Sequence, residues 1–225
     1  ATKIMFINQI ANLCESVGAD VHHVAKGMGL DRRIGGKFLH PGPGYGGSCF
    51  PKDTQALVRT AEEHHEPMTI VEAVVAANLR QKRRMVDKIV QAAGGSLVGV
   101  TAGVLGLTFK PNTDDMRDSP SLLILPELVR LGARVVAYDP EIRGVASDHF
   151  PEGVTFATDA YAACREVDLV LILTEWNQFR NLDLTMIRSG MRTRPDGRYL
   201  FCDFRNIYEP AAMQRAGFHY VCVGR

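Results

Sequence analysis

The chain has 225 residues, of which 46% are hydrophobic and 23% charged, with a formal net charge of +1 at pH 7. This composition is typical of a globular protein with one large or two small domains. Because the charges balance, we expect neither nucleic acid nor a membrane surface as a partner. No apolar run approaches the roughly 18 residues of a transmembrane helix, and the first residues do not resemble a signal peptide.

The five cysteines are scattered along the chain without a C-x-x-C pair, at Cys14, Cys49, Cys164, Cys202 and Cys222. This pattern argues against a disulfide framework and against a zinc site, so we expect no metal, and it is typical of a reducing cytoplasm. The chain opens on Ala1 inside a helical pattern, without a methionine or a capping residue. We therefore expect it to be part of a longer protein.

Residues 1–93 have the apolar spacing of helices. Ile4, Ile7, Ile10 and Cys14 recur at helical intervals up to residue 17, and Asp20 is a predicted cap for a second helix over residues 21–28. Residues 31–51 are rich in Gly and Pro and form a predicted loop, which two further helices follow over residues 52–63 and 69–93. The basic stretch at residues 80–88 is interpreted as a solvated helix face.

After residue 95 the apolar period shortens. Strands are predicted at residues 97–107, 134–138, 167–174, 199–203 and 219–223, with helices at 121–131, 158–166 and 210–216. Short apolar strands that alternate with helices form a parallel sheet. We therefore predict an α/β protein in which a helical domain, residues 1–95, precedes a Rossmann-like domain, residues 96–225.

The turn after the first predicted strand is a candidate ligand site, because the carboxyl ends of parallel strands bind ligands in α/β folds. Gly103 and Gly106 do not form the G-x-G-x-x-G signature of dinucleotide binding. Lys110 lies in this turn instead, where a lysine suits a phosphate group. On the local sequence alone, a solvated lysine is an equally good interpretation.

The most informative segment surrounds Cys49. Four glycines occupy positions 42–47 and allow a ligand to approach the main chain closely. Cys49 then precedes a predicted helix that begins near Pro51, with Lys52 and Asp53 in its first turn. The helix dipole and Lys52 would favour the thiolate, so Cys49 is a candidate nucleophile with Asp53 as a nearby acid or base.

Four segments together resemble the UDP-glucose dehydrogenase family. They are residues 42–53, residues 6–15, residues 106–120 and the Thr174-Glu175-Trp176 triplet, in family order and at family spacing. The resemblance implies the family architecture of an NAD-binding Rossmann domain, a central helical segment that forms a homodimer, and a Rossmann-like domain that binds UDP. The chain resembles the last two parts, so most of the NAD site and the family's catalytic lysine and asparagine would lie before Ala1.

The resemblance also implies a reaction, the oxidation of UDP-glucose to UDP-glucuronate in two hydride transfers to NAD through a thioester on cysteine. In this reaction Cys49 is the implied nucleophile and Asp53 the residue that assists water. The implied contacts with the sugar nucleotide are Arg33, which reaches the neighbouring subunit's sugar, and Phe38, Leu39, His40, Pro41, Gly42, Gly46 and Lys110, whereas Lys52 and Arg117 are implied to lie near NAD. Phe204 replaces the small residue usual in the family and leaves the role of Arg205 open.

Three alternatives remain at this point. A GDP-mannose dehydrogenase shares the glycine–cysteine loop, although residues 33–45 look closer to the UDP-glucose type. The isolated chain, lacking an NAD domain, would be a non-catalytic nucleotide-sugar-binding and dimerisation module. A cysteine hydrolase needs a histidine base, and none of the seven histidines occurs in a motif with Cys49.

Overall fold

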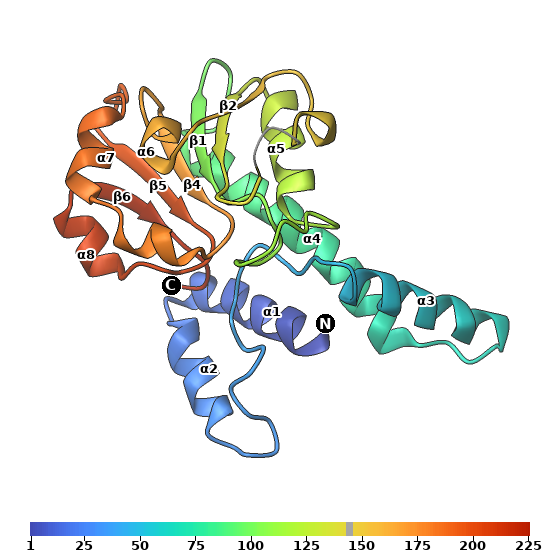
Figure 1. The fold of residues 1–225 in the computed structure, drawn as a ribbon. Coiled ribbons are helices and arrows are strands. Elements are labelled where there is room, and N and C mark those ends of the chain that lie inside the picture. The colour runs from blue at the N-terminus through green and yellow to red at the C-terminus, as the bar shows by residue number, and fades with distance from the viewer. Residues whose placement is uncertain (143–145) are drawn as a thin grey trace.

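A computed structural model describes residues 1–142 and 146–225 (Figure 1). Its first part is helical, as predicted, with α1 at Thr2–Val17, α2 at Val21–Gly29, α3 at Phe50–Glu63 and α4 at Thr69–Ala92. The N–H of His22 donates to Asp20 Oδ1 at 2.8 Å, which confirms the predicted cap of α2. Helix α3 and the first turns of α4 form a hairpin that projects away from the rest of the molecule (Figure 1).

The second part is built on a six-stranded parallel sheet, which confirms the predicted α/β class. Its strands are β1 at Thr101–Leu105, β2 at Arg134–Tyr138, β3 at Val154–Phe156, β4 at Leu169–Ile172, β5 at Tyr199–Asp203 and β6 at Phe218–Val221. They lie in the order β3-β2-β1-β4-β5-β6, so the chain winds outward from the sheet's centre in both directions. The connecting helices are α5 at Ser121–Arg130, α6 at Ala160–Ala163, α7 at Leu184–Gly190 and α8 at Pro210–Arg215. Two 3₁₀ turns, η1 at Ala146–His149 and η2 at Asn177–Asn181, complete the described elements.

Several predicted boundaries differ from the structure. The apolar run 97–107 forms a strand only over Thr101–Leu105, because residues 97–100 make a turn in which Val100 N–H donates to Leu97 C=O at 3.0 Å. The predicted helix 158–166 is the single turn Ala160–Ala163, and Glu166 takes a left-handed φ of 54°. Strand β3 and helix α7 were not predicted, since segments of three and seven residues are too short for a periodic apolar pattern to be recognised.

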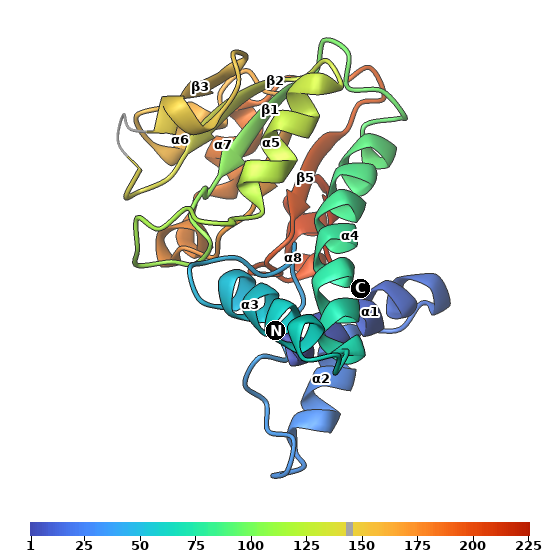
Figure 2. The same cartoon turned by 90° about the vertical axis from the view of Figure 1, so that its right-hand side faces the viewer.

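Helices cover both faces of the sheet. One face packs side chains such as Ala102, Val104 and Leu171 against α1, α2, α4 and α5. The other packs Leu105, Val170 and Phe201 against α6, α7 and α8. Helix α4 takes part in both halves of the molecule: its first turns contact α3, and its later turns contact α5 beside the sheet (Figure 2).

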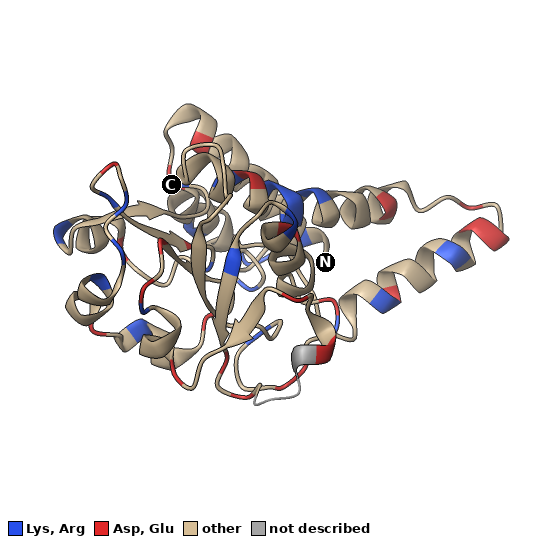
Figure 3. Ribbon diagram, turned by 90° about the horizontal axis from the view of Figure 1, so that it is seen from above, with Lys and Arg blue, Asp and Glu red and all other residues tan. Residues whose placement is uncertain are grey.

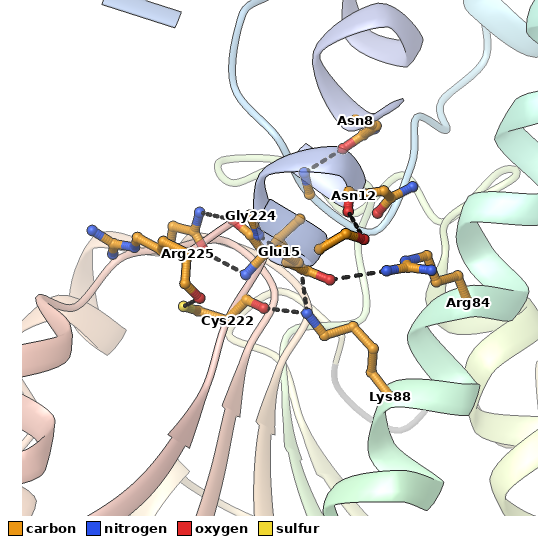
Figure 4. A network of polar contacts seen from close by, with 12 residues as sticks. Asn8, Asn12, Glu15, Arg84, Lys88, Cys222, Gly224 and Arg225 are labelled. Carbon is orange, nitrogen blue, oxygen red and sulfur yellow. Dashed lines mark hydrogen bonds and ion pairs between the residues drawn. The ribbon is translucent and has the colours of Figure 1, made fainter. Parts of the chain in front are cut away.

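A partly buried ionic network joins the helical part to the C-terminal segment (Figure 4). Glu15 of α1 accepts from Lys88 Nζ at 2.5 Å, from Arg84 Nη2 at 3.0 Å and from the N–H of Gly224 at 2.8 Å. Lys88 Nζ also donates to the C=O of Cys222 at 2.5 Å. These contacts attach residues 222–224 to α1 and α4 and fix the sheet against the helical part.

The prediction of a solvated basic face at residues 80–88 is therefore wrong for part of the stretch. Lys82 is 8% exposed, and its Nζ donates to the C=O of Asp118 at 2.8 Å. The side chain of Lys88 is only 14% exposed. Lysine stems can be buried along apolar surface while the ammonium group finds an oxygen, and composition alone does not reveal that arrangement.

The surface carries both signs of charge on each half of the molecule, and neither sign dominates the view in Figure 3. Within residues 1–142 and 146–225, no helix combines the length and apolar character that crossing a membrane requires.

Candidate functional site

Polar and aromatic side chains gather where three neighbouring strands end. Phe109 and Lys110 follow β1, Glu175 follows β4 and Arg205 follows β5. Strands β1 and β4 are adjacent, and the chain order reverses between them. In open parallel sheets this switch point, at the carboxyl edge, is where ligands bind.

A cavity of about 430 Å³ lies between these strand ends and the glycine-rich loop. It is lined by Phe38, His40, Gly42, Gly44, Tyr45, Gly46 and Phe50 of the loop segment, by Phe109, Lys110, Glu175 and Arg205 of the strand ends, and by Ile4, Asn8 and Lys37. Its volume falls in the range of sites for small molecules. The structure thus brings together five of the predicted ligand contacts: Phe38, His40, Gly42, Gly46 and Lys110.

Glycine is required in this loop for two separate reasons. Gly44 and Gly47 have φ values of 113° and 89°, in the left-handed region that side chains disfavour. At Gly46 a Cβ atom would lie 2.4 Å from the C=O of Asp118. The loop and the segment after β1 are also hydrogen-bonded, since Gly47 N–H donates to the C=O of Arg117 at 2.7 Å. The loop therefore packs directly against the segment that follows β1 in the sheet domain.

Arg205 reaches the cavity despite the bulky residue before it. Phe204 is fully buried in the core and does not obstruct the arginine. Arg205 Nε donates to the C=O of Leu173 at 2.7 Å, and Nη2 donates to the C=O of Phe109 at 3.2 Å. Its Nε also lies 3.1 Å from Glu175 Oε2, an ion pair without hydrogen-bond geometry. These contacts fix a cation at the cavity wall.

The remaining predicted reactive residues form a second group, at the start of α3. Cys49 is exposed and occupies the N-cap position, where the C=O of Cys49 accepts from the N–H of Asp53 at 2.8 Å. Lys52 Nζ lies 3.6 Å from Asp53 Oδ1, so the charge of Lys52 is shared with this carboxylate. The sulfur of Cys49 therefore lies at the N-terminus of α3 and is open to solvent.

The other four cysteines are buried and differ from Cys49 in their chemistry. Burial raises the pKa of Cys164 and of Cys202 to about 12, and that of Cys222 to about 11. At neutral pH these thiols are almost entirely protonated and out of reach of solutes. Cys49 is the cysteine that a ligand or reagent can meet.

Four predicted residues lie away from the cavity. Leu39 and Pro41 are buried and face a separate hollow beside α2. Arg33 is exposed and ion-paired with Asp31 at 2.6 Å, on the loop after α2. Arg117 is exposed and ion-paired with Asp115 at 2.8 Å, in the segment after β1 that contacts the glycine-rich loop.

The turn after β1 does not offer the phosphate cradle of a dinucleotide site. The buried carboxylate of Asp139 accepts from the N–H of Leu107 at 2.7 Å and from the N–H of Thr108 at 3.1 Å. It also accepts from Trp176 Nε1 at 3.1 Å. Backbone N–H groups that would otherwise face a pyrophosphate are thus used within the protein.

Several cavity residues had no individual role predicted from the sequence, namely Asn8, Tyr45, Phe50, Phe109 and Glu175. Phe109 and Glu175 lie inside recognisable motifs and follow strands, so their position at the carboxyl edge was a usable signal. Asn8 also lies inside a recognised segment, residues 6–15, but that segment did not indicate a contact with a loop 34 residues later.

The fold and site describe a protein with a Rossmann-like domain, a cavity at the switch point of its sheet, and an exposed cysteine, Cys49, next in sequence to Phe50 of the cavity lining. Residues 1–80 match the central domain of the UDP-glucose/GDP-mannose dehydrogenase family, and residues 103–210 match its UDP binding domain. The chain belongs to this family.

Named relatives agree with this assignment. The chain is 53% identical to UDP-glucose 6-dehydrogenase of Rhizobium meliloti (strain 1021), covering all of this chain and 50% of the relative. It is 47% identical to UDP-glucose 6-dehydrogenase TuaD of Bacillus subtilis (strain 168), covering all of this chain and 48% of the relative. The chain therefore spans about half the length of these relatives.

A solved structure shares the fold. A UDP-glucose dehydrogenase from Pyrobaculum islandicum superposes with a TM-score of 0.81 at 36% identity, over 98% of this chain and 47% of that one.

Proposed function

We propose that the chain forms the central and UDP-binding parts of an NAD-dependent UDP-glucose 6-dehydrogenase, which converts UDP-glucose to UDP-glucuronate. The observation that carries the proposal is the cavity at the switch point of the sheet, closed by the glycine loop that leads to the exposed Cys49. Cations on the strand ends suit a diphosphate, and the loop suits the sugar. The relatives described above support UDP-glucose over GDP-mannose, and the unpaired cysteines support a cytoplasmic location.

In this proposal the reactions at the sugar's C6 use the residues at the start of α3. The Cys49 sulfur adds to the C6 aldehyde and forms a C–S bond, while the aldehyde oxygen takes up a proton. Loss of a hydride from C6 and of the proton from its hydroxyl group then leaves a thioester. Water then adds to it with Asp53 accepting its proton, and the C–S bond breaks to release the acid and the thiol. NAD, when bound, would accept the two hydrides.

The NAD site would lie mainly outside this chain, with Lys52 and Arg117 at its edge. The isolated chain is accordingly proposed to bind the nucleotide sugar without oxidising it. Arg33 is exposed on a loop, which suits the proposed contact with the sugar of a neighbouring subunit.

Lys110 provides a direct test of the UDP site. Replacing Lys110 with alanine is expected to weaken UDP binding by the chain about tenfold, since a charge-assisted contact with phosphate contributes about 1.5 kcal/mol. Uridine has no phosphate and should bind both proteins equally. Isothermal titration calorimetry measures both affinities. Lys26→Ala, which removes an exposed lysine of α2, is the matched control. Unchanged UDP binding by Lys110→Ala would contradict the assignment.

We also propose that the chain is a homodimer joined through its helical part. Helix α1 exposes Phe6, Leu13 and Val17, and α4 exposes Ile70, which is 70% accessible. Large exposed apolar side chains along a helical surface are typical of an interface. Light scattering on dilute protein is expected to give a mass near twice 24.8 kDa. A mass of 24.8 kDa at all concentrations would refute the dimer.

A further inference from the structure

Three carboxamide side chains lie buried beneath the glycine-rich loop and have no part in the proposed chemistry. Asn8 comes from α1 and is fully buried. Asn78 and Gln81 come from α4 and are 8% and 2% exposed. Burying an amide is costly unless its hydrogen bonds are made, so the partners of these groups show what the burial achieves.

All three carboxamides bond to the backbone of the loop. Gly42 N–H donates to Asn8 Oδ1 at 2.8 Å, and Gly42 C=O accepts from Gln81 Nε2 at 2.9 Å. Tyr45 N–H donates to Asn78 Oδ1 at 2.8 Å, and Tyr45 C=O accepts from Asn78 Nδ2 at 3.1 Å. Both backbone groups of both residues are therefore satisfied by side chains, as a neighbouring strand would satisfy them in a sheet.

The orientation of Gln81 is fixed in turn by a neighbour. Asn12, one turn after Asn8 on α1, donates from Nδ2 to Gln81 Oε1 at 3.1 Å, which leaves Nε2 as the donor to Gly42. Figure 4 shows Asn8, Asn12 and Glu15 along one side of α1. The same helix side thus holds the loop through Asn8, α4 through Asn12, and the C-terminal segment through Glu15.

We propose that Asn8, Asn78 and Gln81 are positioning residues that hold the loop in the one conformation in which its backbone lines the cavity and Cys49 faces the sugar. A loop with four glycines in six positions has many accessible conformations, and ordering it costs entropy. Because the carboxamides order the loop before the ligand arrives, binding does not have to supply that ordering. The identity of the sugar nucleotide rests on the proposed function, whereas the ordering of the loop does not.

The loop can be tested without a ligand by amide hydrogen exchange on the 225-residue chain. In Asn78→Leu, which keeps the side-chain shape, exchange at Tyr45 N–H is expected to rise at least tenfold, and Asn8→Leu should do the same at Gly42 N–H. Amides in the centres of β1 and β4 should keep their protection. Unchanged loop exchange in variants that retain the sheet's protection would overturn the proposal.

A variant whose β1 and β4 amides lose their protection from exchange has unfolded and does not report on the loop. A second pair of variants with smaller structural effects is therefore included. Gln81→Met removes the donor to Gly42 C=O together with the acceptor of Asn12 Nδ2, and Gln91→Met makes the same substitution at an exposed site on the same helix. The first is expected to speed exchange at Gly42 and the second to leave it unchanged. Equal exchange in these two variants would equally overturn the proposal.

Ligand binding separates positioning from general stability. The strand ends face the diphosphate and the loop faces the sugar, so Gln81→Met is expected to weaken UDP-glucose binding about tenfold and UDP binding less than twofold. Equal losses for both ligands would mean that the carboxamides only stabilise the fold, contrary to the proposal. Failure of the unaltered chain to bind UDP would count against the proposed function, and the exchange measurements would still decide the role of the carboxamides.

Discussion

Under the proposed function, replacing Cys49 with alanine is expected to abolish uronate formation by an enzyme that joins this chain to an NAD-binding domain. Removing a nucleophile commonly lowers turnover by a factor on the order of 10⁴ or more. Without the sulfur, the aldehyde cannot form the cysteine adduct from which the second hydride leaves to give a thioester. The measurement is NADH formed per UDP-glucose together with chromatography of the sugar nucleotides.

Cys164→Ala is the matched control, because it removes a buried thiol on the opposite side of the sheet domain. It should retain most of the activity. Alkylation of the unaltered protein near pH 7 should also modify Cys49 first, since the other four cysteines are buried and burial raises the pKa of Cys164, Cys202 and Cys222. Normal uronate production by Cys49→Ala, or faster labelling at Cys164, would rule out the nucleophile assignment.

Replacing Glu15 with glutamine is expected to lower the free energy of unfolding by about 2–3 kcal/mol. Breaking a buried ion pair leaves its partner charge desolvated, at a cost of about 3–5 kcal/mol, and the partial exposure of Arg84 reduces that cost. Urea denaturation of both proteins measures the difference. Glu127→Gln removes an exposed partner of Arg130 and should change stability by less than about 0.5 kcal/mol. Equal effects of the two substitutions would show that the network contributes no more than a surface pair.

The effect of Glu15 should depend on pH in a defined direction. Burial pushes its pKa upward, but the hydrogen bonds from Lys88 and Gly224 outweigh burial, so the pKa lies below its ordinary value of 4.5. The unfolded chain therefore binds the proton more readily than the folded one. The stability difference between the unaltered protein and Glu15→Gln should be constant above about pH 5 and shrink as the pH falls through the lowered pKa. A difference that grows on acidification would contradict this account.

Patterns with a local physical cause could be predicted from the sequence. The cap at Asp20, the helix start at Pro51 and the change of apolar period near residue 95 each follow from neighbouring residues, and the structure has all three features. The glycine–cysteine loop was recognisable for the same reason, because its unusual composition lies within a dozen residues.

Features that depend on distant partners could not be predicted. Asn8 reads as one more polar position on an apolar helix, and only the fold brings Gly42 to it. Lys82 and Lys88 look like solvated charges until their partners Asp118 and Glu15 are seen. The position of Arg205 in the cavity wall likewise depends on the sheet order, which places the end of β5 next to that of β4.

The contact between Glu15 and Gly224 has a consequence for biosynthesis. The two residues are separated by 209 positions, so α1 leaves the ribosome long before its partner segment is made. Until then Glu15 lacks its contact with the N–H of Gly224, and Lys88 lacks its contact with the C=O of Cys222. The contacts that join α1 and α4 to residues 222–224 can therefore form only after the strands of the sheet have been synthesised.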